Sequence, residues 1–385
     1  MRGPQIFLSP GPTTVPVRVA HAEGRPMVSH RSSDFSAVFR QMTEGVQAVF
    51  RTKNDLLTLT ASGTGGMEAV AANLFSAGDQ VLVASVGNFG DRFRKILESF
   101  GIVVEYMEFP WGQAVDPAAI RARLEQDTEH RLKAVVLQHN ETSTGVANPI
   151  AAVSAARGDH PAILVVDSIS GMAAVPLETD LWNVDVVIAA SQKAFMSPPG
   201  LCFVSLNERA WQLYGRSTLP KYYFDFGLAK KNLAKYQTPH TPAVSLVYAV
   251  AEATAMIAEE GLDAVLAAHA LRRDIVRAGV EAIGLRPLVQ NVEYASPAVS
   301  CIVAPEGIAP DAIRKIMKEK YNVHIASGMG KLKDSTFRIP HLGYMNDMDL
   351  LSALAALEMA LAELGYAFPL GAGVAAAQRV MMARC

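Results

Sequence analysis

The stretch from Ile163 to Phe195 constrains the fold of this chain more than any other. Residues 163–166 are apolar and run into Asp167, and a second apolar run, after a loop, ends at Ser191-Gln192-Lys193. Uninterrupted apolar strands are typical of parallel sheets that helices cover on both faces. Because the carboxyl ends of parallel strands meet at one edge of a sheet, we expect Asp167 and Lys193 to lie close together.

The same alternation of apolar runs and amphipathic helical patterns extends over the first two thirds of the chain. We predict strands at 55–60, 80–85, 102–107, 133–138, 162–167, 185–190 and 200–206, and helices at 34–50, 67–75, 91–100, 117–126 and 150–157. The last two strands are close together in the sequence, so that one of them can be an antiparallel partner. This pattern predicts an α/β protein with a mostly parallel sheet.

The pattern changes at Gly261, which separates two long predicted helices. These helices cover 242–260 and 262–283, and after them we predict strands at 298–304, 323–326 and 336–339 and helices at 309–320, 347–364 and within 366–385. Residues 5–19 are rich in proline and predict an irregular arm with neither helix nor strand. The predicted domains are an N-terminal arm (1–15), a large domain (16–260) and a small C-terminal α+β domain (261–385).

Composition narrows the class of protein but does not indicate a function. Apolar residues make up 50% of the chain, charged residues 19%, and the net charge is −2; these values argue against disorder and against a nucleic-acid partner. No apolar run predicts a membrane span or a signal peptide. The three cysteines are far apart, without metal-ligand spacing, so we expect a cytoplasmic protein with no metal site.

A glycine-rich turn, Ser62-Gly63-Thr64-Gly65-Gly66, lies between a predicted strand and a predicted helix. Free backbone N–H groups at a helix N-terminus can bind a phosphate. An ordinary tight turn explains the motif equally well at this stage. Glu68 stands where a dinucleotide-binding fingerprint has its third glycine, which argues against a dehydrogenase.

Two further segments follow strand ends and are expected at the same edge of the sheet. Phe89 follows one strand and could stack on a flat ring, although a core position is the simpler reading; residues 139–145, HNETSTG, follow another. Lys193 is flanked by apolar residues, where burial should lower the pKa of its amine. Pyridoxal 5′-phosphate (PLP) requires a lysine for its Schiff base and an acid beside its pyridine nitrogen. The Asp167–Lys193 pair therefore predicts PLP.

Together, HNETSTG at 139–145, VVDSISG at 165–171 and ASQKAF at 190–195 resemble the class V aminotransferases of PLP fold type I. The resemblance is greatest to alanine–glyoxylate and serine–glyoxylate aminotransferases, and it extends from SPGPTTVP at 9–16 to FRIPHLG at 337–343. It implies a large domain with a mostly parallel seven-stranded sheet, a smaller C-terminal α+β domain, bound PLP and a homodimer with shared active sites.

The resemblance also implies roles for individual residues. Lys193 forms the aldimine with PLP and moves the substrate proton, and Asp167 keeps the pyridine nitrogen protonated. Arg338 binds the substrate α-carboxylate, with Gly11 beside it. The other cofactor-binding residues that it implies are Ser62, Gly63, Thr64 and Gln192 at the phosphate, Phe89 on the ring, Thr142 at the ring hydroxyl or the neighbouring carboxylate, and Thr238 and Thr241 from the partner subunit.

The strand pattern around Arg338 also supports a binding role without the resemblance, because alternation places this residue on the face opposite to Phe337 and Ile339. A solvent-facing arginine is the alternative. Pro340 stands where relatives often have a glycine, so the local backbone can differ. Ser29-His30-Arg31 resembles a family segment near the active site, but a salt bridge within the fold is an equally good explanation.

The predicted function is a ping-pong transamination from a small L-amino acid, alanine or serine, to a 2-oxo acid such as glyoxylate or pyruvate. Other donors in this family, namely aspartate, ureidoglycine and 2-aminoethylphosphonate, stay open. A lyase of the same fold is the nearest rival, but a desulfurase needs an exposed cysteine, and residues 324–333 contain none. A binding protein without turnover is a second rival.

Overall fold

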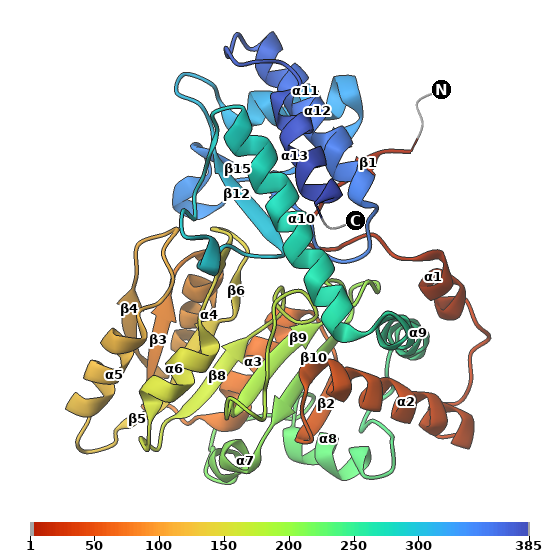
Figure 1. Ribbon diagram of the computed structural model, residues 1–385. Helices are drawn as coiled ribbons and strands as arrows, with labels where there is room; N and C mark the ends of the chain where they lie inside the picture. The colour runs from red at the N-terminus through yellow and green to blue at the C-terminus, as the bar shows by residue number, and fades with distance from the viewer. Residues whose placement is uncertain (1–3, 384–385) are drawn as a thin grey trace.

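A computed structural model describes residues 4–383. Its largest element is a seven-stranded sheet (Figure 1). In sheet order the strands are β2 (Asp55–Thr60), β10 (Leu201–Leu206), β9 (Val186–Ala190), β8 (Ile163–Asp167), β5 (Leu132–Gln138), β3 (Gln80–Ser85) and β4 (Val103–Glu108). Strand β10 is antiparallel to both neighbours, and all other pairs are parallel. The predicted α/β fold with a mostly parallel seven-stranded sheet is confirmed.

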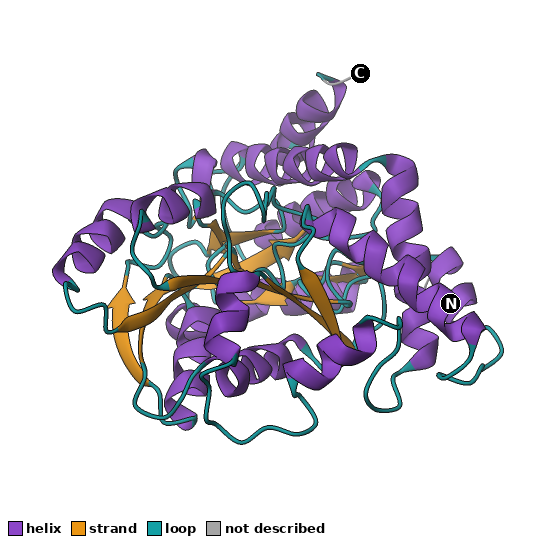
Figure 2. Ribbon diagram, turned by 90° about the horizontal axis from the view of Figure 1, so that it is seen from below, coloured by secondary structure: helices purple, strands orange, loops and turns teal. Residues whose placement is uncertain are grey.

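Helices cover both faces of this sheet (Figure 2). Alternate strand residues face opposite sides, as Leu82 and Val83 show by their membership of two different apolar clusters. The first face packs against α2 (Ser33–Phe50), α5 (Pro117–Gln126), α6 (Ile150–Arg157) and α9 (Val244–Glu260). The second packs against α3 (Gly63–Leu74), α4 (Asn88–Ser99), α7 (Glu208–Tyr214) and α8 (Phe226–Leu233).

The C-terminal third has its own antiparallel sheet and its own apolar cluster. The sheet order is β11 (Arg286–Pro287), β12 (Val299–Val303), β15 (Thr336–Pro340) and β14 (Ala326–Ser327). The cluster joins this sheet to α10 (Leu262–Ala282), α11 (Pro310–Tyr321), α12 (Asp347–Glu363) and α13 (Ala372–Met382). Short elements complete this part of the chain, η1 (Val292–Tyr294) and η2 (Gly330–Leu332). A division into domains at Gly261 stays a prediction.

The N-terminal prediction was partly wrong. Residues 5–19 include β1 (Ile6–Phe7), which pairs in parallel with β13 (Val323–His324), and the start of α1 (Val17–Glu23). The arm becomes a strand because the backbone N–H of Ile6 donates to the carbonyl of Asn322 at 3.1 Å. Pro16 lies at the cap of α1, where the missing N–H of a proline breaks no helical bond.

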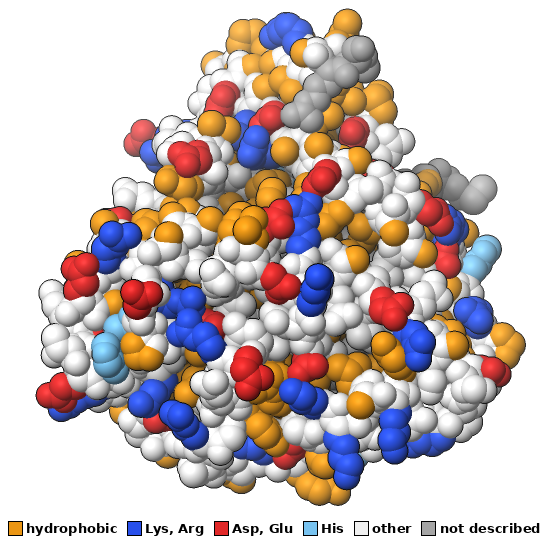
Figure 3. Space-filling view, turned by 60° about the horizontal axis from the view of Figure 1, so that its bottom comes forward, with side chains coloured by type: hydrophobic (Ala, Val, Ile, Leu, Met, Phe, Trp, Pro, Cys, Tyr) orange, Lys and Arg blue, Asp and Glu red, His pale blue; other side chains and the backbone are white. Residues whose placement is uncertain are grey.

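Several other boundaries differ from the prediction by one to four residues. Helix α3 begins at Gly63 rather than at 67, because the Ser62 side chain accepts a hydrogen bond from the N–H of Gly65 and caps the helix. The single strand predicted at 323–326 is divided between β13 and β14. Within residues 4–383, no helix combines the length and the apolar character that crossing a membrane requires. Basic and acidic side chains are interspersed on the face drawn in Figure 3.

Candidate active site

A cavity of about 110 Å³ lies at the carboxyl edge of the large sheet, where β8 ends at Asp167 and the loop after β9 carries Lys193. The structure brings most of the predicted site residues together here. The lining residues are Ser62, Gly63, Thr64, Met67, Phe89, Arg92, Asn140, Thr142, Asp167, Ile169, Ser170, Gln192 and Lys193. The edge of a parallel sheet thus collects side chains from five separate segments.

Lys193 is held between the sheet and the N-terminal arm. Its Nζ donates a hydrogen bond to the carbonyl of Pro10 at 2.5 Å, and a Cβ on Gly11 would lie 2.3 Å from that nitrogen. The hydroxyl of Thr13 fixes the loop by donating to the Lys193 carbonyl at 2.9 Å. Burial lowers the pKa of Lys193 to about 8, although Asp167 opposes the shift. Roughly a tenth of this lysine is therefore a neutral amine at pH 7, far more than at the ordinary pKa of 10.5.

Asp167 is 5% exposed, and one of its oxygens accepts a hydrogen bond from the N–H of Ile169 at 2.9 Å. Burial raises the pKa of Asp167 to about 6, while the Ile169 bond, the nearby side chain of Gln138 and the positive charges of Lys193 and Arg92 oppose this rise. The ionised form is short of partners, so it can pair with a cationic group inside the cavity.

Two observations test whether the cavity fits PLP. The Oδ1 of Asn140 and the Oε1 of Gln192 are buried without a hydrogen-bond partner among the described residues, and both side chains line the cavity. Buried polar atoms of this kind call for a polar ligand. Gly63, in the first turn of α3, has no room for a side chain, since a Cβ would lie 2.5 Å from Ile169. The close backbone and the free donors suit a phosphate group.

The first turn of α4 is fixed by Glu141, in the β6–β7 hairpin (Asn140–Glu141 and Val146–Ala147). Its carboxylate accepts hydrogen bonds from the N–H groups of Phe89 at 3.0 Å and Gly90 at 3.1 Å, and from the hydroxyl of Ser143 at 2.6 Å. Burial raises the pKa of Glu141 to about 7. Glu141 therefore positions Phe89 at the cavity.

Arg338 lies on β15, with Phe337 and Ile339 packed in the C-terminal apolar cluster on the opposite face, as alternation predicted. The guanidinium is 5% exposed and bridges two carbonyls: Nε donates to Ser327 at 2.7 Å and Nη1 to Thr142 at 2.8 Å. Arg338 is thus linked to the cavity wall without lining the cavity. Pro340 ends β15 in register with Val299 and does not interrupt the strand.

Thr238 and Thr241 do not reach the Lys193 cavity of their own chain. They line a separate small pocket with Tyr223 and His240, among others. Arg31 holds this segment, since its Nη1 donates to the carbonyl of Thr238 at 2.7 Å. Within the described residues Arg31 has no ion pair, so the salt bridge considered for Ser29-His30-Arg31 is replaced by hydrogen bonds to carbonyls.

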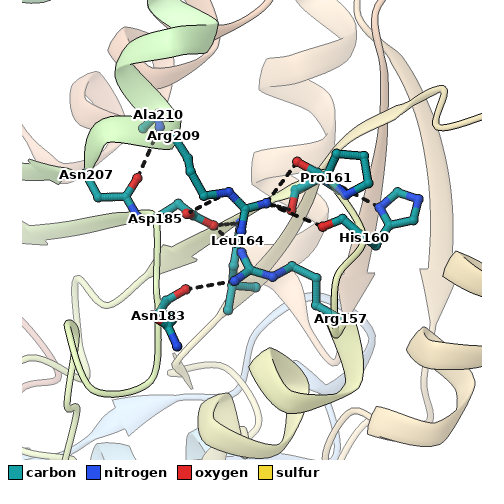
Figure 4. A network of polar contacts seen from close by, with 10 residues as sticks. Arg157, His160, Pro161, Leu164, Asn183, Asp185, Asn207, Arg209 and Ala210 are labelled. Atoms are coloured by element: carbon teal, nitrogen blue, oxygen red, sulfur yellow. Dashed lines mark hydrogen bonds and ion pairs between the residues drawn. The ribbon is translucent and has the colours of Figure 1, made fainter.

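A second buried polar cluster lies at the opposite, amino edge of the sheet (Figure 4). Asp185, just before β9, is 1% exposed and forms an ion pair with Arg157. It also accepts hydrogen bonds from the N–H of Leu164 at 2.7 Å and the amide of Asn207 at 2.8 Å. Arg209 approaches the same carboxylate at 3.6 Å.

The fold and the Lys193–Asp167 cavity define a PLP-dependent aminotransferase of fold type I, and the comparisons agree. A pyridoxamine–pyruvate aminotransferase from Mesorhizobium loti superposes with a TM-score of 0.94 at 28% identity, covering 100% of this chain and 98% of that one. Residues 17–334 match the family Aminotransferase class-V. The chain belongs to the class V aminotransferases.

Curated relatives cover nearly the whole chain under differing names. A protein of Synechococcus sp. (strain PCC 6716) named as a soluble hydrogenase small subunit is 42% identical over 99% of both chains. An L-aspartate–glyoxylate aminotransferase from Paracoccus denitrificans is 37% identical, covering 97% of this chain and 95% of its own. A serine–glyoxylate aminotransferase from Methylorubrum extorquens is also 37% identical, covering 96% and 94%.

Two charged residues at the site, Arg92 and Glu141, were not predicted individually from the sequence. Arg92 lines the cavity, and its position one helical turn after Phe89 was the available signal, because residues three apart share a helix face. Glu141 was noted only as part of its motif. Its role depends on contacts with α4, more than fifty residues earlier in the chain, which no local pattern reveals.

Proposed function

We propose that this aminotransferase moves the amino group of a small L-amino acid, alanine or serine, to a 2-oxo acid such as glyoxylate or pyruvate. The observation that carries the proposal is the buried Lys193–Asp167 pair at one cavity with unpartnered polar atoms. PLP, when bound, supplies an electron sink that stabilises negative charge at the substrate α-carbon. Residues of this chain must bind and orient the cofactor and the substrate and must move the proton.

Lys193 is proposed as the covalent anchor and the proton carrier. Its low pKa supplies the neutral amine that attack on an aldehyde requires, and the same amine can take a proton from the substrate α-carbon. The arm at Pro10 and Gly11 covers this amine and limits its freedom. Asp167 is proposed to hold a proton on the ring nitrogen by its charge.

The other predicted residues are proposed to fix the cofactor. Ser62, Gly63 and Thr64 at the N-terminus of α3, with Gln192, would bind the phosphate, and Phe89 would stack on the ring. The hydroxyl of Thr142 donates to Ser170 at 2.7 Å, so it is held at the wall near Asp167.

Arg338 is proposed to bind the substrate α-carboxylate, with Gly11 beside it. Within residues 4–383, hydrogen bonds engage its Nε and Nη1, and none engages its Nη2. A charge-assisted bond from Nη2 would orient the α-carbon toward Lys193.

A homodimer with shared active sites is part of the proposal. Thr238 and Thr241 lie outside the cavity of their own chain, on a segment that Arg31 holds in place. Their predicted contact with the phosphate therefore requires the cavity of a second copy. A cytoplasmic location stays a prediction.

The donor and the acceptor are tested by initial rates. L-alanine, L-serine, L-aspartate, ureidoglycine and 2-aminoethylphosphonate are each paired with glyoxylate and pyruvate, and both products are quantified. The proposal predicts the highest kcat/KM for alanine or serine, with parallel double-reciprocal lines for a ping-pong mechanism. A clear preference for aspartate, or release of ammonia or sulfide without an amino product, would contradict it.

No observation favours a second function. The only cysteines among residues 4–383, Cys202 and Cys301, are buried, and burial raises the pKa of both thiols, which does not suit a sulfur-transfer nucleophile. In the same range no group of three or more His, Cys, Asp or Glu side chains could hold a metal ion. The hydrogenase name of the Synechococcus relative therefore carries no proposal for this chain.

A further inference from the structure

Arg92 is a cation at the cavity that no role described above uses. It lies in the second turn of α4, and its guanidinium is 4.7 Å from the centre of the Phe89 ring. Its Nη1 donates to the hydroxyl of Thr64 at 3.4 Å. Arg92 thus contacts both the aromatic ring proposed for the cofactor ring and the turn proposed for its phosphate.

Within the described residues, no carboxylate neutralises Arg92, which forms none of the ion pairs found there. The neighbouring Asp91 is turned away, since it accepts hydrogen bonds from Ser85 at 3.0 Å and Tyr106 at 2.6 Å. Among residues 4–383, the only acid that lines the cavity is Asp167. If Asp167 pairs with a ring nitrogen, the guanidinium of Arg92 remains available to bind a different negatively charged group.

We propose that Arg92 is a phosphate-binding residue, which places its guanidinium against the cofactor phosphate across from the N-terminus of α3. This inference rests on the proposed function. A phosphate dianion at the Ser62–Thr64 turn would have backbone N–H groups on one side and the planar fork of Arg92 on the other. Burial is the main cause of both pKa shifts in the cavity; the charge of Arg92 adds to the lowering of the Lys193 pKa and opposes the raising of the Asp167 pKa.

Pyridoxal lacks the phosphate, so comparing it with PLP separates phosphate binding by Arg92 from two alternative roles. These are the positioning of Phe89 and the binding of a substrate side chain. The cofactor-free protein is titrated with PLP and with pyridoxal, and the bound form is followed by absorbance. The variants are Arg92→Gln, Arg92→Lys and, as a matched control, Arg94→Gln. Arg94 lies on the same helix and over a ring, that of Tyr106 at 4.3 Å, but outside the cavity.

Arg92→Gln is expected to weaken PLP binding roughly 10- to 100-fold and pyridoxal binding less than about twofold, because a hydrogen bond between charged groups is lost. Arg92→Lys should fall between, and Arg94→Gln should bind like the wild type. An equal loss for PLP and pyridoxal would overturn the proposal in favour of a role in positioning Phe89. Unchanged PLP binding with a raised KM for L-aspartate alone would also overturn it and assign Arg92 to the substrate side chain.

The outcome is distinguishable from failure of the proposed function. If the proposed function is wrong because the cavity does not hold PLP, the wild-type protein binds neither PLP nor pyridoxal through Lys193; if it is wrong in the donor or the reaction, the initial-rate assay fails while the wild type still binds PLP. If only this inference is wrong, the wild type binds PLP and transaminates, and Arg92→Gln either binds PLP equally well or loses PLP and pyridoxal affinity alike. Circular dichroism of each variant shows whether the fold is kept, and Arg92→Lys still tests the fork geometry if Arg92→Gln does not fold.

Discussion

The two edges of the large sheet each contain a buried aspartate, and the two are partnered very differently. At the amino edge, Asp185 accepts bonds from a backbone N–H and a side-chain amide and is paired with buried Arg157 (Figure 4). At the carboxyl edge, Asp167 accepts one backbone hydrogen bond and faces a cavity. Asp185 directly precedes β9, and Asp167 ends the neighbouring β8, paired with Ile188 of β9.

This difference separates structure from function. A buried carboxylate whose oxygens are all hydrogen-bonded or ion-paired within the protein links structural elements. Removing one of its partners leaves an unpaired buried charge. A buried charge left short of partners, with a displaced pKa, is a candidate for chemistry. We therefore expect substitutions at the amino edge to change stability without changing activity. Substitutions at the carboxyl edge should change activity, and their effect on stability should be limited to the pH range in which the buried group is charged.

The largest effect is expected at Lys193. Lys193→Ala removes the residue proposed as both covalent anchor and proton carrier, so turnover should fall by at least roughly 10⁴-fold. The measurement is the rate of the donor half-reaction, with the melting temperature as the control for folding. Retention of more than a few per cent of activity would remove the proposed role of this lysine.

The next effect is on stability, at the amino edge. Arg157→Ala strands the charge of Asp185 in the core and should lower the free energy of unfolding by about 3–5 kcal/mol, without changing kcat per folded molecule. Arg209→Ala is the matched control, because this partly exposed arginine is 3.6 Å from Asp185 and should contribute about 1 kcal/mol. Urea unfolding and active-site titration measure the two quantities. A loss of kcat in folded Arg157→Ala would contradict the claim that the amino edge contributes to stability and not to activity.

Arg338 tests the carboxyl edge without removing its charge. Arg338→Lys keeps a cation but loses the planar guanidinium that bonds the carbonyls of Ser327 and Thr142 and is proposed to bind the substrate carboxylate. We expect kcat/KM for the amino donor to fall roughly 10- to 100-fold while PLP affinity stays unchanged. If PLP affinity falls and the donor kinetics do not, Arg338 belongs to the cofactor site.

The smallest effect is a pH dependence of the cofactor-free protein. Because folding lowers the pKa of Lys193 from 10.5 to about 8, the unfolded chain holds the proton more tightly between these values. The resulting destabilisation is complete below pH 8 and disappears as the pH rises toward 10.5. Lys193→Met should therefore raise the melting temperature by a few degrees at pH 7 and leave it unchanged near pH 10.5. An equal rise at both pH values would contradict the buried amine.

For Asp167, the buried group destabilises the cofactor-free protein on the upper side of the pH range. Folding raises its pKa from 3.8 to about 6, so its destabilisation is absent below pH 3.8 and complete above pH 6. Asp167→Asn should raise the melting temperature of the cofactor-free protein at pH 7 but not near pH 4. A stabilisation that is already full near pH 4 would show that the carboxyl is not the cause.

The sequence predicted the sheet and the residues at its carboxyl edge because both follow from local patterns. An apolar run in the sequence shows where a buried strand ends, and the carboxyl ends of parallel strands lie at the same edge of a sheet. The positions of Asp167, Lys193 and the 62–64 turn at that edge could therefore be predicted from the sequence. The Asp185 cluster was not predicted, because an aspartate before a strand has the same local pattern whether or not an arginine reaches it. The β1 strand was missed because its pairing partner is more than three hundred residues away.

The central claim, that Lys193 and Asp167 hold a working PLP, is tested most directly by an absorbance spectrum of the purified protein before and after L-alanine, L-serine or L-aspartate is added. The account predicts a visible band that moves to the near-ultraviolet with alanine or serine and is absent from Lys193→Ala. No visible band in the wild-type protein, even after PLP is added, would contradict the account, as would a band that no amino donor changes.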